Sequence, residues 1–222
     1  MTQFFTLYAL PERVRMLSAK EALERLKEGN ARFAADSARP HKRAEEAHPS
    51  DVADGQEPFA IILGCSDSRV PAEIVFDQTL GDLFVIRVAG NVLAPSLVGS
   101  IEFAAEHFGT SLVVVLGHTK CGAVKATVDI VEGHTEIPSP NLHAIIDQIT
   151  PVVEAERENN PDASSQDIRE RAIRSNVCAS VDGLLAMSPV LKKRSDSGNL
   201  TIVGAEYCLE TGAVDFFHGV SD

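Results

Sequence analysis

Two short segments, CSDSR at 65–69 and GHTKCG at 117–122, carry the residues of this chain best suited to chemistry. Together they supply two thiols and an imidazole, from Cys65, Cys121 and His118. Thiolate and imidazole ligands are the set that suits zinc. A structural zinc takes four protein ligands, whereas three ligands leave a position for water, as in a catalytic zinc site. The alternative is that each cysteine is a small buried apolar residue and His118 a buried core histidine.

Asp67 and Arg69 belong to the same turn as Cys65, and a carboxylate and a guanidinium at this spacing can form a bidentate pair. Beside a zinc ion, Asp67 could accept a hydrogen bond from zinc-bound water, or it could take the fourth zinc position itself. A structural ion pair without a catalytic role is the third interpretation. Because two thiolates neutralise Zn²⁺, we expect the pKa of the bound water to exceed the value of about 7 seen with neutral ligands. Activity should therefore improve above neutral pH.

The elements that must position these segments are short apolar runs that alternate with helical patterns. Such runs indicate a mainly parallel sheet covered on both faces, with reacting groups gathered at the carboxyl ends of its strands. We therefore predict an α/β fold with a mainly parallel central sheet flanked by helices and preceded by an N-terminal helical arm. The predicted strands are 59–63, 83–88, 112–116, 200–203 and 214–217, and the predicted helices are 71–77, 96–108, 123–131 and, with a break near 160, 141–187.

The arm begins at Ser18, which with Glu21 has the form of a capping box, and apolar residues recur at helical spacing as far as Phe33. The apolar face of this helix could pack on its own domain or on a second subunit. We divide the chain into an arm (1–35) that packs on a partner subunit and a single α/β zinc-enzyme domain (36–222), which opens with a long polar loop at 36–58.

Composition limits the partners. The chain has 222 residues, 44% of them hydrophobic and 23% charged, as in soluble globular proteins. Its 32 acidic and 20 basic residues give a net charge of −12, which repels nucleic-acid phosphates and anionic lipid, so we expect no nucleic acid and no membrane as a partner. Four cysteines are too few for a disulfide scaffold, and no apolar run is long enough to span a bilayer. We expect a cytoplasmic protein with reduced thiols that acts on a small molecule.

The motifs CSDSR and GHTKCGA, in this order, resemble those of the β-class carbonic anhydrases, and the layout matches from residue 17 to about residue 217. The resemblance implies reversible hydration of CO2 to bicarbonate and a proton, by attack of zinc-bound hydroxide, with one Zn²⁺ per chain. It assigns Cys65, His118 and Cys121 as zinc ligands and Asp67 with Arg69 as the catalytic pair. It also implies a homodimer at least, with a homotetramer as the expected state.

The resemblance further implies a substrate pocket. Gln56 matches a glutamine that hydrogen-bonds substrate oxygen, and Gly122 matches a position whose N–H reaches the substrate. Phe84, Ala89 and Phe103 match the apolar wall, which suits an uncharged substrate such as CO2. Ala89 is smaller than the usual branched residue, and Phe103 replaces a frequent tyrosine. For the two phenylalanines, ordinary core packing is the alternative.

The resemblance leaves a subtype and two other functions to consider. Some bacterial members carry a tryptophan three residues before the first zinc cysteine, as part of a non-catalytic bicarbonate site. This chain has Ile62 there and no tryptophan, although Arg87 matches that site's arginine, so we expect the plant-like subtype with Asp67 off the metal. One alternative function is hydrolysis of carbonyl sulfide or carbon disulfide at the same zinc. The other is a non-enzymatic zinc- or bicarbonate-sensing role, against which the intact Asp67 and Arg69 argue.

Overall fold

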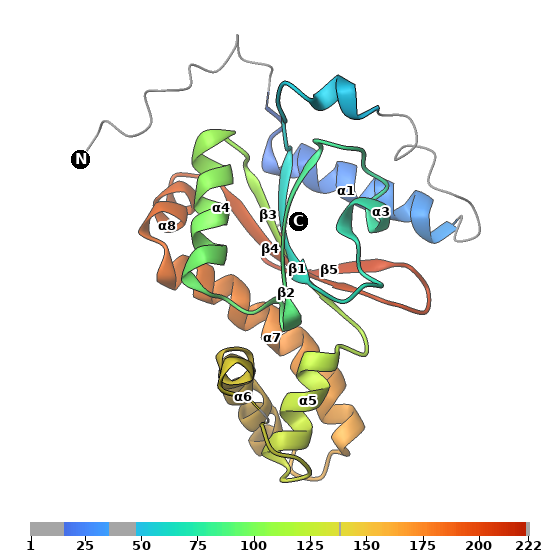
Figure 1. The fold of residues 1–222 in the computed structure, drawn as a ribbon, viewed down its shortest axis with the longest axis vertical. Helices are drawn as coiled ribbons and strands as arrows, with labels where there is room; N and C mark the ends of the chain where they lie inside the picture. The colour runs from blue at the N-terminus through green and yellow to red at the C-terminus, as the bar shows by residue number, and fades with distance from the viewer. Residues whose placement is uncertain (1–15, 36–47, 138, 221–222) are drawn as a thin grey trace.

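A computed structural model of the 222-residue chain describes residues 16–35, 48–137 and 139–220. The described residues form a five-stranded sheet of order β2-β1-β3-β4-β5, in which the first four strands are parallel and β5 runs antiparallel to β4 (Figure 1). The predicted α/β class and mainly parallel sheet are therefore confirmed. The strands are β1 (Ala60–Cys65), β2 (Leu83–Val88), β3 (Leu112–His118), β4 (Thr201–Tyr207) and β5 (Val214–His218).

The central strands β1 and β3 carry the two motifs. Every residue of both strands is buried, as expected for continuous apolar runs covered on both faces of a parallel sheet. Both strands extend beyond their predicted ends at 63 and 116, so that Cys65 and His118 are their last residues. Gly64 stays in the sheet because it pairs with both neighbouring strands. A side chain at Gly117 would place its Cβ 2.6 Å from Val177, so this glycine lets α7 approach the sheet.

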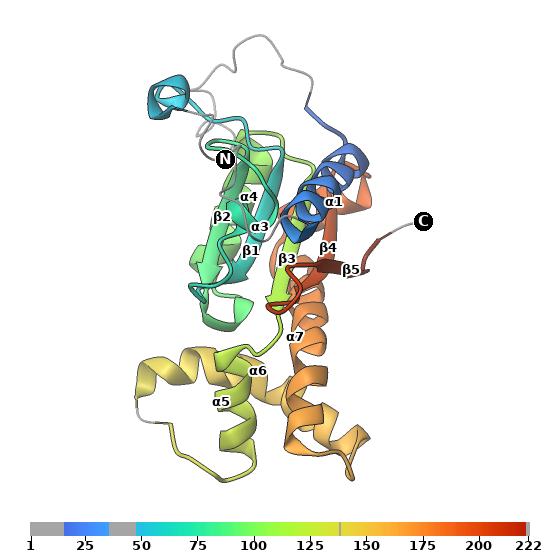
Figure 2. The same ribbon diagram turned by 90° about the vertical axis from the view of Figure 1, so that its right-hand side faces the viewer.

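Helices cover both faces of the sheet and extend beyond its carboxyl edge. One face packs against α1 and α3, and the other against α4, α8 and the second half of α7 (Figure 1). Beyond the carboxyl edge, α5, α6 and the first half of α7 form a lobe with its own apolar core (Figure 2). Within the described residues, no helix has the length and hydropathy needed to cross a membrane. The helices are α1 (Ala19–Ala35), α3 (Ala72–Val75), α4 (Pro95–His107), α5 (Gly122–Val131), α6 (Pro140–Asn159), α7 (Ser165–Met187), α8 (Pro189–Asp196) and the 3-10 turns η1 (Pro49–Val52) and η2 (Ala89–Asn91).

The N-terminal helix forms as predicted. Its capping box is present, since the Ser18 N–H donates to Glu21 Oε2 at 2.8 Å and the Glu21 N–H donates to Ser18 Oγ at 3.3 Å. Leu23 and Leu26 on its inner face pack into the core of the same chain. Contact between residues 1–35 and a partner subunit stays a prediction, and residues 1–15 lie outside the described ranges. So do 36–47 of the predicted polar loop, whose remainder contains η1.

Candidate metal centre

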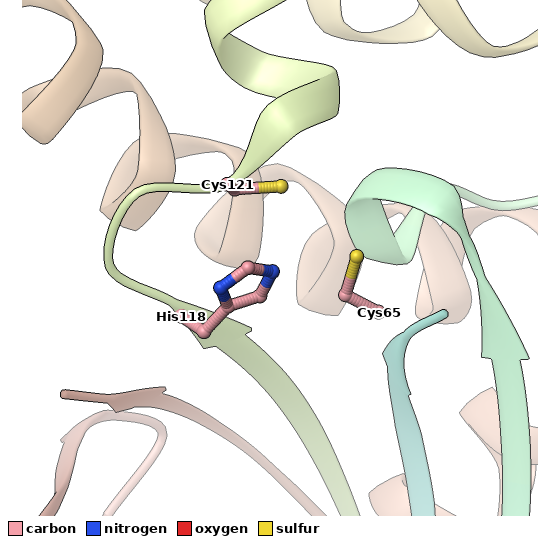
Figure 3. A group of neighbouring side chains, drawn as sticks. All are labelled: Cys65, His118 and Cys121. Atoms are coloured by element: carbon pink, nitrogen blue, oxygen red, sulfur yellow. The ribbon is translucent and has the colours of Figure 1, made fainter. Parts of the chain in front are cut away.

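Three separate elements bring two thiols and an imidazole to one point at the carboxyl edge of the sheet. Cys65 ends β1, His118 ends β3, and Cys121 is the N-cap of α5. Their ligand atoms all lie within 4.8 Å of one another, and the residues are only 5%, 0% and 3% exposed, respectively. The three side chains face one another in Figure 3. The predicted convergence of these residues is confirmed.

The imidazole is oriented to bind a metal. His118 Nδ1 lies 2.9 Å from the carbonyl oxygen of Thr119. Because a carbonyl can only accept a hydrogen bond, Nδ1 carries a proton, and in a neutral imidazole this leaves the lone pair on Nε2. Nε2 is buried and has no hydrogen-bond partner within the described part of the chain. A buried nitrogen in this state is costly unless a ligand satisfies it.

The two thiols also fit a cation. A hydrogen bond from Cys121 holds the pKa of Cys65 well below its usual value, while the same contact and burial raise the pKa of Cys121. This contact favours one thiolate beside one thiol, and a cation bound between them would favour ionisation of the second. Two sulfur ligands and one nitrogen ligand suit Zn²⁺ better than the oxygen-seeking Mg²⁺ or Ca²⁺. The residues present fit a zinc ion.

The Cys65 side is held by a residue of β2 and by the turn that follows this strand. The Gly90 N–H donates to Cys65 Sγ at 3.3 Å, and its carbonyl accepts from Asn176 Nδ2 of α7 at 2.8 Å. Arg87 donates from Nε to the Cys65 carbonyl at 3.0 Å and from Nη2 to the Asp67 carbonyl at 2.6 Å. Arg87 thus braces the backbone of the CSDSR segment. These contacts fix the direction in which the Cys65 thiol points.

Asp67 and Arg69 form the predicted bidentate pair. Arg69 Nε donates to Asp67 Oδ1 at 2.9 Å, Arg69 Nη2 donates to Oδ2 at 2.7 Å, and the Arg69 N–H donates to Oδ1 at 3.0 Å. These bonds from Arg69 hold the pKa of Asp67 well below its usual range, so the carboxylate is ionised at neutral pH. Asp67 Oδ2 also lies 3.9 Å from His118 Nε2. The carboxylate therefore borders the metal centre while Arg69 occupies both its oxygens.

The predicted pocket residues lie in three places. Ala89 begins η2, directly before Gly90, and Gly122 begins α5, directly after Cys121. Phe84 of β2 and Phe103 of α4 have ring centroids 6.3 Å apart, and Phe103 is 46% exposed. Gln56 is exposed in the segment that leads to β1. Gly122 is therefore adjacent to the ligand Cys121, and Ala89 is adjacent to Gly90, whose N–H donates to Cys65 Sγ. The substrate-binding role of all five residues stays a prediction.

Sequence reasoning missed the supporting role of Gly90, Asn176 and Thr119. Gly90 has a φ of +71°, and a glycine two residues after a predicted strand was the available signal for an unusual turn. Asn176 is 3% exposed within a predicted helical block, and its type alone does not reveal a partner 86 positions away. Thr119 lies between the ligands His118 and Cys121, and its residue type does not reveal that its hydroxyl contacts Leu209.

Comparisons with known proteins agree with this geometry. The family model described as "Carbonic anhydrase" matches residues 60–214. Carbonic anhydrase 2 of Mycobacterium tuberculosis is 39% identical over 191 residues, which is 86% of this chain and 89% of the relative. The crystal structure of a β-carbonic anhydrase of Aspergillus fumigatus superposes with a TM-score of 0.69 at 26% identity, covering 91% of this chain and 92% of that one. Tetrameric β-carbonic anhydrases from Sordaria macrospora share the fold, with a TM-score of 0.69 at 22% identity over 86% of this chain and 93% of theirs.

Proposed function

The chain belongs to the β-class carbonic anhydrase family, and we propose that it is a zinc enzyme that interconverts CO2 and water with bicarbonate and a proton. The observation that carries the proposal is the buried group of Cys65, His118 and Cys121. Within the described residues, His118 Nε2 has no hydrogen-bond partner and is available to bind a metal. An ionised Asp67 stands beside this group. A binding protein would need the three ligands but not this carboxylate.

Each residue of the site has a distinct task. A zinc ion held by Cys65, His118 and Cys121 would supply a Lewis acid that lowers the pKa of water and so provides a nucleophile for CO2. Asp67 accepts a hydrogen bond from the attacking water and so orients its lone pair toward the carbon of CO2. Arg69 keeps Asp67 ionised and in place. The proton released when water adds to CO2 passes to buffer.

We propose the plant-like arrangement, in which Asp67 stays off the metal. In its support, three hydrogen bonds from Arg69 engage both Asp67 oxygens, and breaking them would leave a guanidinium without its partner. Arg87, which matches the arginine of the non-catalytic bicarbonate site, is engaged by the Cys65 and Asp67 carbonyls instead. Ile62 is fully buried within β1, where the bacterial site would need a tryptophan.

Around this centre we propose that Phe84, Ala89 and Phe103 provide an apolar wall, while Gln56 and the Gly122 N–H contact substrate oxygen. Phe103 and Gln56 are both exposed in the single chain, which suits a pocket completed by a second copy. We therefore propose a homodimer at least, with residues 1–35 packing on the partner, and a homotetramer as the full assembly.

A cytoplasmic location is proposed because the free thiols of Cys65 and Cys121 must stay reduced to bind zinc.

The test is CO2 hydration by stopped flow on protein of determined zinc content, before zinc removal, after it and after zinc is restored. One zinc per chain and activity that follows the zinc would support the proposal. Carbonyl sulfide hydrolysis, measured on the same samples by sulfide release, is the competing activity. Full zinc with sulfide release and no CO2 hydration would replace the proposal with that hydrolase, and full zinc with neither activity would leave only a binding role.

A further inference from the structure

We propose that Thr119 is a positioning residue of the metal centre, whose side-chain hydroxyl fixes the peptide group that orients His118. The proposal rests on the proposed zinc site but not on the substrate. Thr119 lies between the ligands His118 and Cys121, and its own side chain is not a ligand in the three-residue group. It acts on the metal only through the imidazole of His118.

All three polar groups of Thr119 are engaged. Its N–H donates to the Tyr207 carbonyl at 3.0 Å, and its Oγ1 accepts from the Leu209 N–H at 3.0 Å. Its carbonyl accepts the proton of His118 Nδ1 at 2.9 Å. The first two bonds fix Thr119 on the last residue of β4 and on the chain that follows it. The third bond passes that orientation to the imidazole ring. Hydrogen bonds of this kind, behind a histidine ligand, set both the tautomer and the direction of the metal-binding nitrogen.

The support on which Thr119 rests is itself firmly held. Leu209 belongs to the hairpin between β4 and β5, and Asn30 of α1 anchors the other side of this hairpin. Asn30, 6% exposed, donates from Nδ2 to the Gly212 carbonyl at 2.8 Å and accepts from the Val214 N–H at 2.8 Å. A hydroxyl bonded to this hairpin is therefore tied to the body of the protein.

The turn at residues 118–121 needs hydrogen bonds that hold it in place. Lys120, the next residue, has a φ of +58°, a left-handed conformation that is unfavourable for a residue with a side chain. The Lys120–Glu210 ion pair also joins the turn to the hairpin, but its side chains are 60% and 69% exposed. Exposed pairs contribute little because solvent screens them. Of these two sets of contacts, the hydrogen bonds of Thr119 therefore hold the turn on the hairpin more firmly.

The test compares Thr119→Val, which keeps the shape but removes the hydroxyl, with Thr119→Ser, which restores it. Zn²⁺ affinity is measured on metal-free protein by competition with a chromophoric chelator, and the ligand geometry is read from the absorption spectrum of the Co²⁺-loaded protein. Loss of a direct hydrogen bond to a metal ligand weakens metal binding by about 10–100-fold. The Thr119 hydroxyl acts one contact further out, through the Thr119 carbonyl, so we expect the lower end, about tenfold, for Thr119→Val. Thr119→Ser should stay within about threefold of the unaltered protein and keep its cobalt spectrum.

Two control variants separate positioning from general loss of stability. Thr110 precedes the opposite end of β3, is 0% exposed and donates from Oγ1 to the Pro58 carbonyl at 2.8 Å. Thr110→Val should lower stability to urea but leave zinc affinity within about threefold. Glu210→Gln removes the exposed ion pair on the same hairpin and should also leave zinc affinity unchanged.

The proposal is overturned if Thr119→Val binds zinc within about threefold of the unaltered protein with the same cobalt spectrum. It is also overturned if Thr110→Val weakens zinc binding as much as Thr119→Val does. Should Thr119→Val fail to fold, Thr119→Ala provides the same comparison with less crowding. Absence of zinc binding in the unaltered protein would instead refute the proposed function, and this inference with it.

Discussion

Gly90 is the residue at which one added methyl group tests the packing beside the metal centre most sharply. Its φ of +71° is left-handed, which costs a residue with a side chain about 1–2 kcal/mol. A Cβ there would lie 2.9 Å from Ile149 Cδ1 and 3.0 Å from Ala123 Cβ, and overpacking of a core costs about 1–3 kcal/mol. Together these costs predict that Gly90→Ala lowers the free energy of unfolding by about 2–5 kcal/mol. The lower entropy of the unfolded alanine chain offsets about 0.4–1 kcal/mol of this loss.

A second glycine provides the matched control. Gly109, which follows α4, also has a φ of +71°, but a Cβ there would meet nothing within 4 Å. The backbone strain and the unfolded-state entropy are common to both substitutions, so the difference between Gly90→Ala and Gly109→Ala isolates the overpacking, about 1–3 kcal/mol. Urea unfolding of the metal-free proteins, followed by circular dichroism, measures both. Equal losses in the two variants, within about 0.5 kcal/mol, would refute the packing described around Gly90.

Further predictions concern the site itself. Cys65→Ala should lose zinc and CO2 hydration together, because it removes a metal ligand, and zinc analysis beside stopped flow would show any separation of the two. Asp67→Asn should retain zinc yet lose most turnover, about 10²–10⁴-fold for the loss of the carboxylate that accepts a hydrogen bond from the water, so an undiminished rate would remove Asp67 from the mechanism. Since Arg69 lowers the folded-state pKa of Asp67, the stability that this carboxylate adds is present at neutral pH and is lost as the pH falls below its unfolded value of about 3.9. The difference in urea stability between the unaltered protein and Asp67→Asn should therefore be constant from neutral pH to about pH 5 and shrink in stronger acid, and it should be small because Arg69 is 54% exposed. A difference that grows in acid would contradict the assigned pKa direction.

The metal ligands could be predicted from sequence because residue type and position agree. Cys65 and His118 follow apolar runs, and the carboxyl ends of parallel strands meet at one edge of the sheet. The ends of these strands were harder to predict from sequence, because a glycine such as Gly64 or Gly117 is typical of the start of a turn. Both instead continue the sheet, and Gly117 does so beneath α7, whose close approach depends on residues sixty positions later.

The supports of the ligands could not be predicted, because they depend on contacts between distant segments. Thr119 is bonded to Leu209 across 90 positions, and Gly90 to Asn176 across 86. The residue type of a threonine or an asparagine does not predict a hydrogen-bond partner so far away in the sequence. For Phe103 the sequence says more than the single chain does. The motif resemblance predicts that it lines the substrate pocket, whereas in the single chain its side chain is exposed.

The most direct test of the central claim is the rate of CO2 hydration across about pH 6.5 to pH 9, on protein whose zinc content is determined. A metal held by Cys65, His118 and Cys121, with Asp67 paired to Arg69 beside it, should give one zinc per chain. The same arrangement predicts activity that rises smoothly through neutral pH. A steep, reversible collapse below about pH 8 would contradict that account, because it would mean that Asp67 leaves Arg69 and occupies the metal.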